Sequence, residues 1–496
     1  MRIRTTLCAL AALGAAGGLA ATGAPADSGD ARTYVVLLDP AASTDAGRAA
    51  IERAGGTVER YNSEVGVATA RSTRDDFAAQ ATAERAIQAA STQRAIGRVP
   101  AESRQKQDRV ALERLQDERR KGGQPGEHPP TPSAEPLDPD IAPNFNKELS
   151  RNFTVDDPVI DGPCASDPDG SCADPNDVDE DGHGTHVAGT IASPLNGQGI
   201  GGVAPRSEIV NLRAGQDSGY FFVQPAVDAI TYAADHGIDV VNMSFYIDPW
   251  LYNCAANPAD SEEAQAQQRT IIAATQRAVD YARSRGVTLV AAAGNEHTDL
   301  GNPTFDDTSP DYPPDAAYDR TVDNSCLDVP TETDGVIPVS SVGPSGRKAY
   351  YSNYGTEQVE VAAPGGDYRD FPGTDRFQSP KNLILAPYPK SVGLASGDID
   401  PKTGEPTNAF VVKDGDAYYQ YLQGTSMAAP HAAGVAALIV SEYGKADRRN
   451  GGLTLAADKT AKILHKTATD TACPNPREFV YPGRPAAETA YCEGSP

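Results

Sequence analysis

Short apolar runs alternate with longer amphipathic segments through the second half of the chain. The predicted strands cover residues 208–212, 238–244, 287–293, 336–342 and 359–363, and the predicted helices cover residues 223–236, 262–285 and 427–443. Uncharged runs such as residues 287–290 suit strands that are buried on both faces. Alternation of such strands with helices predicts an α/β fold, in which a mostly parallel sheet carries helices on both faces.

The N-terminal part of the chain has a different pattern. Its predicted elements are a strand at residues 34–38, a helix at 45–54, strands within 57–70, and helical spacing across the Ala-rich residues 75–97. They predict a small α+β domain over residues 27–98. Residues 99–138 are polar and contain repeated prolines, which predicts an exposed linker that proteases can cut. Residues 139–496 then form the larger domain, and no internal repeat is found.

Residues 1–26 have the features of a secretory signal. Arg2 and Arg4 precede a run of small and apolar residues, and Ala24-Pro25-Ala26 provides small residues for cleavage. The alternative, a membrane anchor, is disfavoured because the run is short and rich in glycine and alanine. We therefore expect a secreted, extracellular protein without a membrane contact. The 68 acidic and 43 basic side chains give a formal net charge of −25, which argues against a nucleic-acid partner.

Six cysteines remain once Cys8 leaves with the signal: Cys164, Cys172, Cys254, Cys326, Cys473 and Cys492. An even number in an exported chain predicts disulfides. The sequence does not choose among the possible pairings, but Cys164–Cys172 and Cys473–Cys492 are locally plausible, which leaves Cys254–Cys326. A metal site is disfavoured because no C-x₂-C pair is present.

The candidate catalytic residues lie in three short segments, residues 181–190, 290–295 and 423–434. Ser426 lies at the junction between a loop, in which Gly424 has no side chain, and the start of an Ala-rich helix. The N–H groups at such a helix start point outward, where they can stabilise a developing oxyanion. The competing interpretation of Ser426 alone is a helix N-cap.

Two further side chains have the chemistry that a reactive hydroxyl needs. His183 stands between glycines at the start of a small-residue helix, where an accessible imidazole can act as general base. His186 is predicted to be buried and hydrogen-bonded, since the Glu of a His-Glu-x-x-His zinc motif is absent. Asn295 follows a buried strand and can donate to an oxyanion, although a turn-forming Asn is the plainer alternative.

Together these segments resemble the subtilisin-like serine peptidases, or subtilases. The resemblance implies that His183 is the general base, Ser426 the nucleophile and Asn295 the oxyanion donor. It also implies that two extended edges line the substrate cleft, made of Asp217, Ser218 and Gly219 and of Ser244, Phe245 and Tyr246. The family usually has glycine where Tyr246 stands. Residues 32–98 resemble the family's propeptide, which assists folding and blocks the cleft until it is removed.

The family's third catalytic residue, an Asp at the end of a buried strand before the His, is not found. Asp161 lacks the following Ser/Thr and the apolar run, Asp217 comes after His183, and Asp138 lies in the linker. The missing strand belongs in the middle of the sheet, so its loss leaves backbone groups without partners. The chain also stops before the small helix that often closes such domains.

The acidic residues before His183 suggest a calcium site. Asp177, Asp179 and Asp181 match the opening of an EF-hand loop, but its twelfth position is Ala188 where that loop has Glu. A solvated acidic loop is therefore the preferred interpretation. No cofactor is required, no metal ligand is assigned, and a structural calcium ion remains an option.

The sequence therefore predicts a secreted serine endopeptidase that is made as a zymogen and has a damaged catalytic triad. The alternatives are a pseudopeptidase that binds peptides without cutting them and a poorly folding product of a deleted gene. The expected partners are peptide or protein substrates and the chain's own propeptide, with no nucleic acid and no membrane. A monomer is expected.

Overall fold

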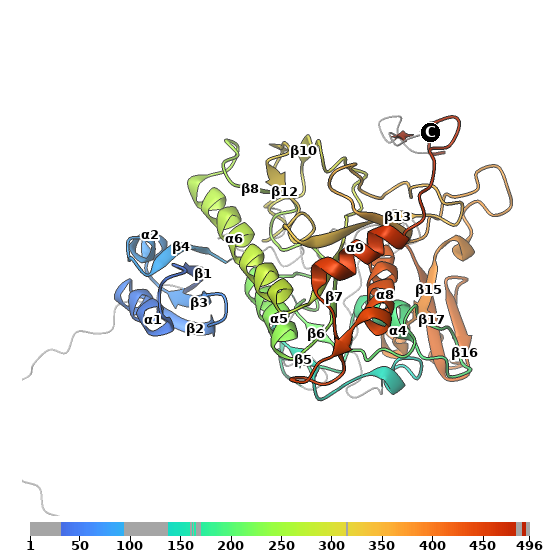
Figure 1. Cartoon of the computed structure of the whole chain (residues 1–496), viewed down its shortest axis with the longest axis horizontal. Helices are drawn as coiled ribbons and strands as arrows, with labels where there is room; N and C mark the ends of the chain where they lie inside the picture. Colours follow the sequence, from blue (N-terminus) through green and yellow to red (C-terminus); the bar gives the residue numbers. More distant parts are fainter. Residues whose placement is uncertain are drawn as a thin grey trace, which may run out of the picture.

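The computed structural model describes residues 31–93, 137–158, 161, 163–164, 170–313, 316–482 and 489–492. The predicted signal at residues 1–26 and nearly all of the linker at residues 99–138 lie outside this part of the chain. Figure 1 shows a small N-terminal domain, in blue, beside a much larger one. No helix among the described residues combines the length and the apolar character needed to cross a bilayer.

The N-terminal domain is a four-stranded antiparallel sheet with two helices. Its elements are β1 (Arg32–Leu38), α1 (Thr44–Arg53), β2 (Thr57–Asn62), β3 (Val67–Ser72), α2 (Phe77–Thr82) and β4 (Ile87–Thr92). The strand order is β2-β3-β1-β4. The predicted helical stretch at residues 75–97 is wrong, because α2 is short and β4 follows it. Ile87 and Ala90 of β4 are buried in the core of this domain while β4 pairs with β1, so tertiary packing overrides the helix propensity of alanine.

The larger domain has the predicted parallel sheet at its centre. Its strands are β7 (Val240–Met243), β9 (Thr288–Ala292), β13 (Val336–Val342) and β14 (Val361–Pro364), in the order β14-β13-β9-β7. Leu289 and Ala291 of β9 pack in one hydrophobic cluster with α5 (Val223–Asp235) and α6 (Glu262–Ser284). Val290 and Ala292 pack on the other face in a cluster with α8 (Thr425–Tyr443) and α9 (Ala457–Thr467). Helices therefore cover both faces, as predicted.

The parallel sheet is interrupted between two consecutive strands. β5 (Arg151–Asn152) and β6 (Leu212–Arg213) form a separate parallel pair, and no strand of the described chain joins β6 to β7. β7 pairs on one side only, with β9, and its first residues are half-buried, whereas all of β9 is buried. The break lies where the sequence predicts that a strand is missing. The strand predicted at residues 208–212 is wrong except at Leu212, since Ile209 makes only an isolated bridge to Phe145.

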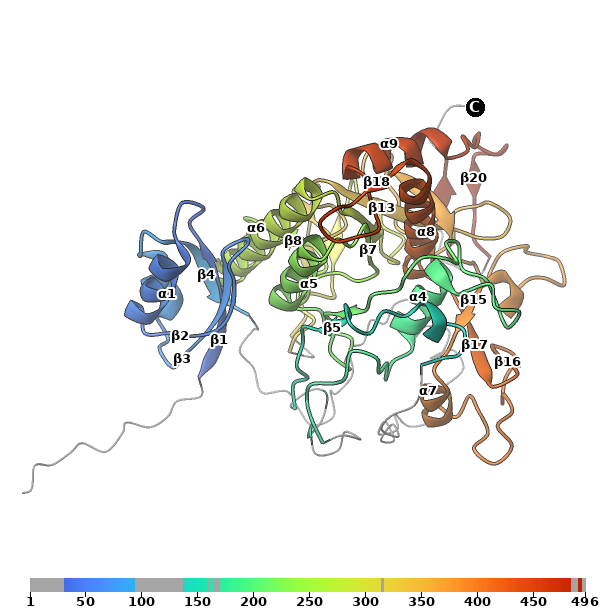
Figure 2. The same ribbon diagram turned by 60° about the horizontal axis from the view of Figure 1, so that its bottom comes forward.

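Smaller elements surround this core. The helical elements are α4 (His183–Ala192), α7 (Lys390–Ala395) and the 3₁₀ turns Ala142–Asn144 and Pro380–Asn382. A three-stranded antiparallel sheet contains β15 (Ile384–Pro387), β17 (Ala417–Leu422) and β16 (Val411–Asp414). The remaining strands form two-stranded pairs: β8 (Asn253–Cys254) with β12 (Cys326–Leu327), β10 (Phe305–Asp306) with β11 (Arg320–Thr321), β18 (Lys445–Ala446) with β19 (Leu453–Thr454), and β20 (Glu478–Phe479) with β21 (Ala490–Tyr491). Figure 2 shows α4 between α8 and the β15–β17 sheet.

The N-terminal domain packs its sheet on α5 and α6, as Figure 2 shows. Val35 and Leu37 of β1 share a hydrophobic cluster with residues of both helices. Asn62 Nδ2 donates to Thr231 Oγ1 on α5 at 2.7 Å, and the Arg277 guanidinium on α6 donates to the Leu38 carbonyl oxygen at 2.8 Å. The two domains therefore meet through an apolar centre bordered by hydrogen bonds.

All three proposed disulfides form, and Cys254–Cys326 closes the longest loop, with a sequence separation of 72 residues. Replacing both cysteines of this pair with serine is expected to lower the free energy of unfolding by about 4 kcal/mol, since the unfolded chain gains freedom. Urea unfolding measures the change. The pair Cys164–Cys172, separated by 8 residues, is the matched control and should cost less. An equal loss for both pairs would contradict the loop-length explanation.

Candidate active site

Ser426 is the second residue of α8, directly after a tightly packed loop. A Cβ atom at Gly365 would lie 2.5 Å from the Gly424 carbonyl oxygen, so only glycine lets the end of β14 approach this loop so closely. Ser426 Oγ donates to the Ser244 carbonyl oxygen at 3.4 Å, and Ser244 Oγ donates to the Ser426 carbonyl oxygen at 3.1 Å. These two bonds hold the start of α8 against the residue that follows β7.

Asn295 is linked to the residue before Ser426. Its Oδ1 accepts from the Thr425 backbone N–H at 2.8 Å and from Thr425 Oγ1 at 3.1 Å. Since the amide oxygen is used in this way, Nδ2 is the polar atom of the side chain that can donate to a ligand. Thr425 Oγ1 also accepts from the Gly294 N–H at 3.1 Å. The structure therefore brings Asn295 beside the start of α8, although the two residues are far apart in sequence.

His183 is the first residue of α4, which packs against α8. Asp179 fixes this helix start: its carboxylate accepts from the Gly182 N–H at 2.7 Å and from the Thr185 N–H at 2.8 Å. Gly182 has a φ of 92°, a conformation that favours glycine. The His183 side chain is half-buried. Among the described residues, no hydrogen bond joins His183 to Ser426, whose hydroxyl is directed to Ser244.

His186 is buried, as the sequence predicted. Its side chain is 1% exposed, and Nε2 lies 3.1 Å from the carbonyl oxygens of both Ile384 and Gln420. Burial lowers the pKa of His186 to about 3, so the imidazole is neutral. His186 therefore joins α4 to the β15–β17 sheet and is not directed toward Ser426.

The first predicted substrate edge is not extended in this structure. Asp217 and Ser218 form a turn, in which the Gly219 N–H donates to the Gln216 carbonyl oxygen at 2.8 Å. The prediction fails because acidic side chains accept the N–H groups of this segment. Asp156 accepts from the Asp217 N–H at 2.9 Å, and Asp161 accepts from the Ser218 N–H at 2.6 Å.

The second predicted edge leaves the end of β7 beside Ser426. Phe245 stacks on Phe221 with ring centroids 4.2 Å apart, and Tyr246 Oη donates to an Asp311 carboxylate oxygen at 2.6 Å. Together with the Ser244 bonds to Ser426, these contacts fix residues 244–246 in irregular backbone. The hydrogen bond to Asp311 fixes the Tyr246 side chain, and the glycine that the family usually has at this position could not make it.

The three aspartates considered for the missing catalytic position have other contacts. Asp161 accepts from Ser218, Asp217 pairs with Arg213, and Asp138 accepts from the Asp140 N–H at 2.8 Å. Burial raises the pKa of Asp138 to about 6. These contacts do not single out any of the three as the partner of His183.

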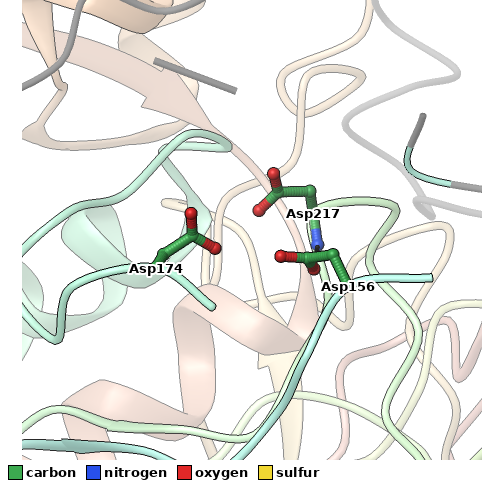
Figure 3. Close-up of side chains that lie close together, drawn as sticks. All are labelled: Asp156, Asp174 and Asp217. Carbon is green, nitrogen blue, oxygen red and sulfur yellow. Dashed lines mark hydrogen bonds between the residues drawn. The ribbon is translucent and has the colours of Figure 1, made fainter. Parts of the chain in front are cut away.

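An acidic cluster that the sequence did not reveal surrounds Arg213. Figure 3 shows the carboxyl groups of Asp156, Asp174 and Asp217 turned toward one another, and their oxygens lie within 4.8 Å. The Arg213 guanidinium lies 2.7 Å from Asp174 and also pairs with Asp217. The cation of this cluster is thus an arginine. The EF-hand-like residues lie elsewhere, because Asp179 caps α4 and Asp177 pairs with Lys147.

Stability is expected to fall as the pH rises through the range in which Asp156 loses its proton. Burial, and then the Asp217 charge, raises the pKa of Asp156 from about 4 to about 8. Between these values the folded state holds a proton that the unfolded chain has released, so higher pH favours unfolding. Differential scanning calorimetry from pH 5 to 9 should show a smaller decline of Tm in Asp156→Asn. Identical declines in both proteins would contradict this account.

Comparison with known proteins assigns the chain to a family. The model of the subtilase family matches residues 135–480, and the chain belongs to this family. The thermophilic serine proteinase of Bacillus sp. (strain AK1) is 29% identical over 313 residues, which are 63% of this chain and 55% of that protein. The chain thus spans about half the length of this relative. Thermitase of Thermoactinomyces vulgaris is 30% identical over 56% of this chain and 68% of its own.

A solved structure supports the fold. The epidermin leader peptide processing serine protease of Staphylococcus aureus aligns with a TM-score of 0.56 and 20% identity, covering 89% of this chain and 100% of that chain. The chain therefore has a subtilase fold.

Proposed function

We propose that this chain is a secreted serine endopeptidase that hydrolyses peptide bonds through Ser426. The observation that supports it is the meeting of three distant segments: Ser426 and Thr425 at the start of α8 bond to the residues that follow β7 and β9. Such a cluster lies at the carboxyl edge of the sheet, where α/β folds bind ligands.

In the proposed reaction, Ser426 Oγ attacks the substrate carbonyl carbon while His183 takes the hydroxyl proton. Asn295 Nδ2 and the N–H groups at the start of α8 stabilise the oxyanion. His183 then returns the proton to the leaving amine, and water hydrolyses the acyl-enzyme. The proposed steps use no metal ion or other cofactor. Whether a calcium ion stabilises the fold is tested by comparing Tm with and without a chelator.

The missing aspartate limits the proposed turnover. In serine proteases, subtilisin among them, loss of this residue lowers kcat by about 10⁴-fold, because the histidine loses its tautomer and orientation. A second function, peptide binding without cleavage, is favoured by one contact: the hydroxyl of Ser426 donates to Ser244 and not to His183.

The N-terminal domain has the proposed role of an inhibitory propeptide, removed after secretion. Its sheet covers α5 and α6, and Arg277 accounts for two of the bonds that hold it, to the carbonyl oxygens of Leu38 and Val65. Residues 94–136, which connect this domain to the larger one in the sequence, lie outside the described residues.

Self-processing tests the peptidase proposal. The chain without residues 1–26 should cut itself between residues 94 and 138, and intact-mass spectrometry should show both products. Ser426→Ala should stay uncut under the same conditions. A folded wild-type chain that remains intact but binds peptides would support the pseudopeptidase, and equal processing of Ser426→Ala would refute a role for Ser426.

A further inference from the structure

Asn353 is fully buried, and both ends of its amide group bond to the segment that contains the proposed oxyanion donor. This segment, residues 294–298, is called the Asn295 loop below. Asn353 Oδ1 accepts from the backbone N–H groups of Glu296 at 3.0 Å and Thr298 at 2.8 Å, and Nδ2 donates to Glu296 Oε2 at 2.8 Å. The Asn353 backbone N–H also donates to the Gly294 carbonyl oxygen at 3.0 Å. Asn353 is therefore bonded to the loop before and after the donor residue.

Two residues of the Asn295 loop have a left-handed backbone conformation. Gly294 has a φ of 94°, and His297, which has a side chain, has a φ of 57°. Such a φ is uncommon for a residue other than glycine, so the contacts around His297 hold it in this conformation. A Cβ atom at Gly294 would lie 2.3 Å from Asn353 Nδ2, so Asn353 packs directly on the backbone of the loop.

Asn353 also supplies the acceptors that the N–H groups of the loop need. Glu296 Oε2, which is bonded to Asn353 Nδ2, accepts from the Asn295 N–H at 2.8 Å. Asn353 thus satisfies three N–H groups of the loop, two directly and one through Glu296. A buried N–H group without an acceptor is unfavourable, so the loop would change conformation if the Asn353 amide were removed.

The segment that carries Asn353 is anchored to the central sheet. The Ser341 N–H on β13 donates to Ser352 Oγ at 2.8 Å, and β13 is almost entirely buried. On the other side of Asn353, the Tyr354 N–H donates to the Thr298 carbonyl oxygen at 3.0 Å. Asn353 therefore connects the Asn295 loop to the sheet, as well as bonding to it.

The Asn295 side chain consequently has two supports. Its Oδ1 accepts from the Thr425 N–H on α8, and its backbone belongs to the loop that Asn353 holds. The position of Nδ2 depends on both supports, because the amide group is short and planar. An oxyanion donor stabilises the transition state when it lies within hydrogen-bond distance of the developing charge, so a small displacement of the loop is costly.

We propose that Asn353 is a positioning residue for the peptidase reaction, and that it fixes the Asn295 loop so that Asn295 Nδ2 reaches the oxyanion. This inference rests on the proposed function and deepens it. Since Asn353 is fully buried, it acts through the loop and not on the substrate. Its removal should therefore slow acyl transfer and leave substrate binding unchanged.

Steady-state kinetics on an activated peptide ester test this. Asn353→Ala should lower kcat about tenfold at unchanged KM, a smaller loss than the 10²–10³-fold expected for removal of the donor itself. In the Asn295→Leu background the same change should lower kcat little further, because the donor is already absent. Asn257→Ala is the matched control, since this buried amide donates to the Thr321 carbonyl oxygen at 2.8 Å and accepts from the Ala259 N–H at 2.9 Å. It should lower Tm and leave kcat unchanged.

An exchange of the two bonded groups keeps the inference testable if Asn353→Ala does not fold. Asn353→Asp places a carboxyl group against Glu296 and should lower kcat, because the donor to Glu296 Oε2 is lost. Adding Glu296→Gln exchanges the amide and the carboxyl group between the two positions and should restore most of the lost kcat. Circular dichroism at the assay temperature establishes that each variant is folded.

The outcomes separate this inference from the function on which it rests. Unchanged kcat in Asn353→Ala, an equal fold-loss in the wild-type and Asn295→Leu backgrounds, or no recovery in the exchanged pair overturns the inference and leaves the peptidase proposal standing. A wild-type chain that turns over no ester and whose Ser426 is not labelled by a fluorophosphonate refutes the proposed function, and this inference with it.

Discussion

Replacing Arg320 with methionine is expected to lower the free energy of unfolding by about 3–5 kcal/mol. The side chains of Arg320, Asp260 and Asp306 are all fully buried. Arg320 bonds to both carboxylate oxygens of Asp260 at 2.9 Å and to Asp306 at 2.8 Å. Methionine fills similar volume but leaves two buried carboxylates without a cation.

Urea unfolding followed by the fluorescence of Trp250, the single tryptophan, measures this loss, since the Arg320 guanidinium lies 4.7 Å from its ring centroid. Adding Asp260→Asn and Asp306→Asn to Arg320→Met should restore part of the stability, because no buried charge then remains. Lys147→Met, which removes an exposed ion pair with Asp177, should change stability by about 1 kcal/mol or less. A loss below about 1 kcal/mol for Arg320→Met would refute the account of this network.

Replacing Asn295 with leucine is expected to lower kcat by about 10²–10³-fold, the effect measured for the corresponding oxyanion donor of subtilisin. Asn295 also holds the Thr425 N–H through Oδ1, so a purely structural effect must be separated from loss of the donor. Asn295→Asp does this, because aspartate keeps the acceptor oxygen but an ionised carboxylate cannot donate.

Both Asn295 variants should lose kcat on an activated peptide ester, and circular dichroism at the assay temperature should show that both remain folded. Ester substrates are chosen because a damaged triad turns over amides slowly. Wild-type kcat in Asn295→Asp would show that Asn295 only supports the start of α8, and the oxyanion role would then be wrong.

The core of the fold was predictable because buried periodicity is a local property of the sequence. The helices predicted at residues 223–236, 262–285 and 427–443 and the strands at 287–293 and 336–342 agree with the structure to within about two residues at each end. The secondary-structure prediction failed at β4 and at residues 208–212, where pairing with distant segments determines the local structure. Helix α9 was missed, although its buried residues Ala457, Thr460 and Leu464 recur at helical spacing.

The sequence motifs predicted the candidate catalytic residues but not the contacts of the residues around them. Short motifs name His183, Asn295 and Ser426, and small-residue patterns around them indicate helix starts. The turn at Asp217 and Ser218 could not be predicted, because it depends on acceptors that come from Asp156 and Asp161.

The break between β6 and β7 has a measurable consequence for the backbone. β9 lies between two strands, whereas the other edge of β7 has no partner strand in the described chain. Hydrogen exchange should therefore be faster for part of residues 240–243 than for residues 288–292. Equal protection of both strands would show that another segment covers the open edge.

Peptide mapping of a fluorophosphonate adduct tests whether Ser426 and His183 act together on one carbonyl group. We expect the adduct on Ser426 in the wild-type chain, no adduct in Ser426→Ala, and much slower labelling in His183→Ala at unchanged Tm. An adduct on another residue, or equal labelling rates for the wild-type chain and His183→Ala, would contradict the claim.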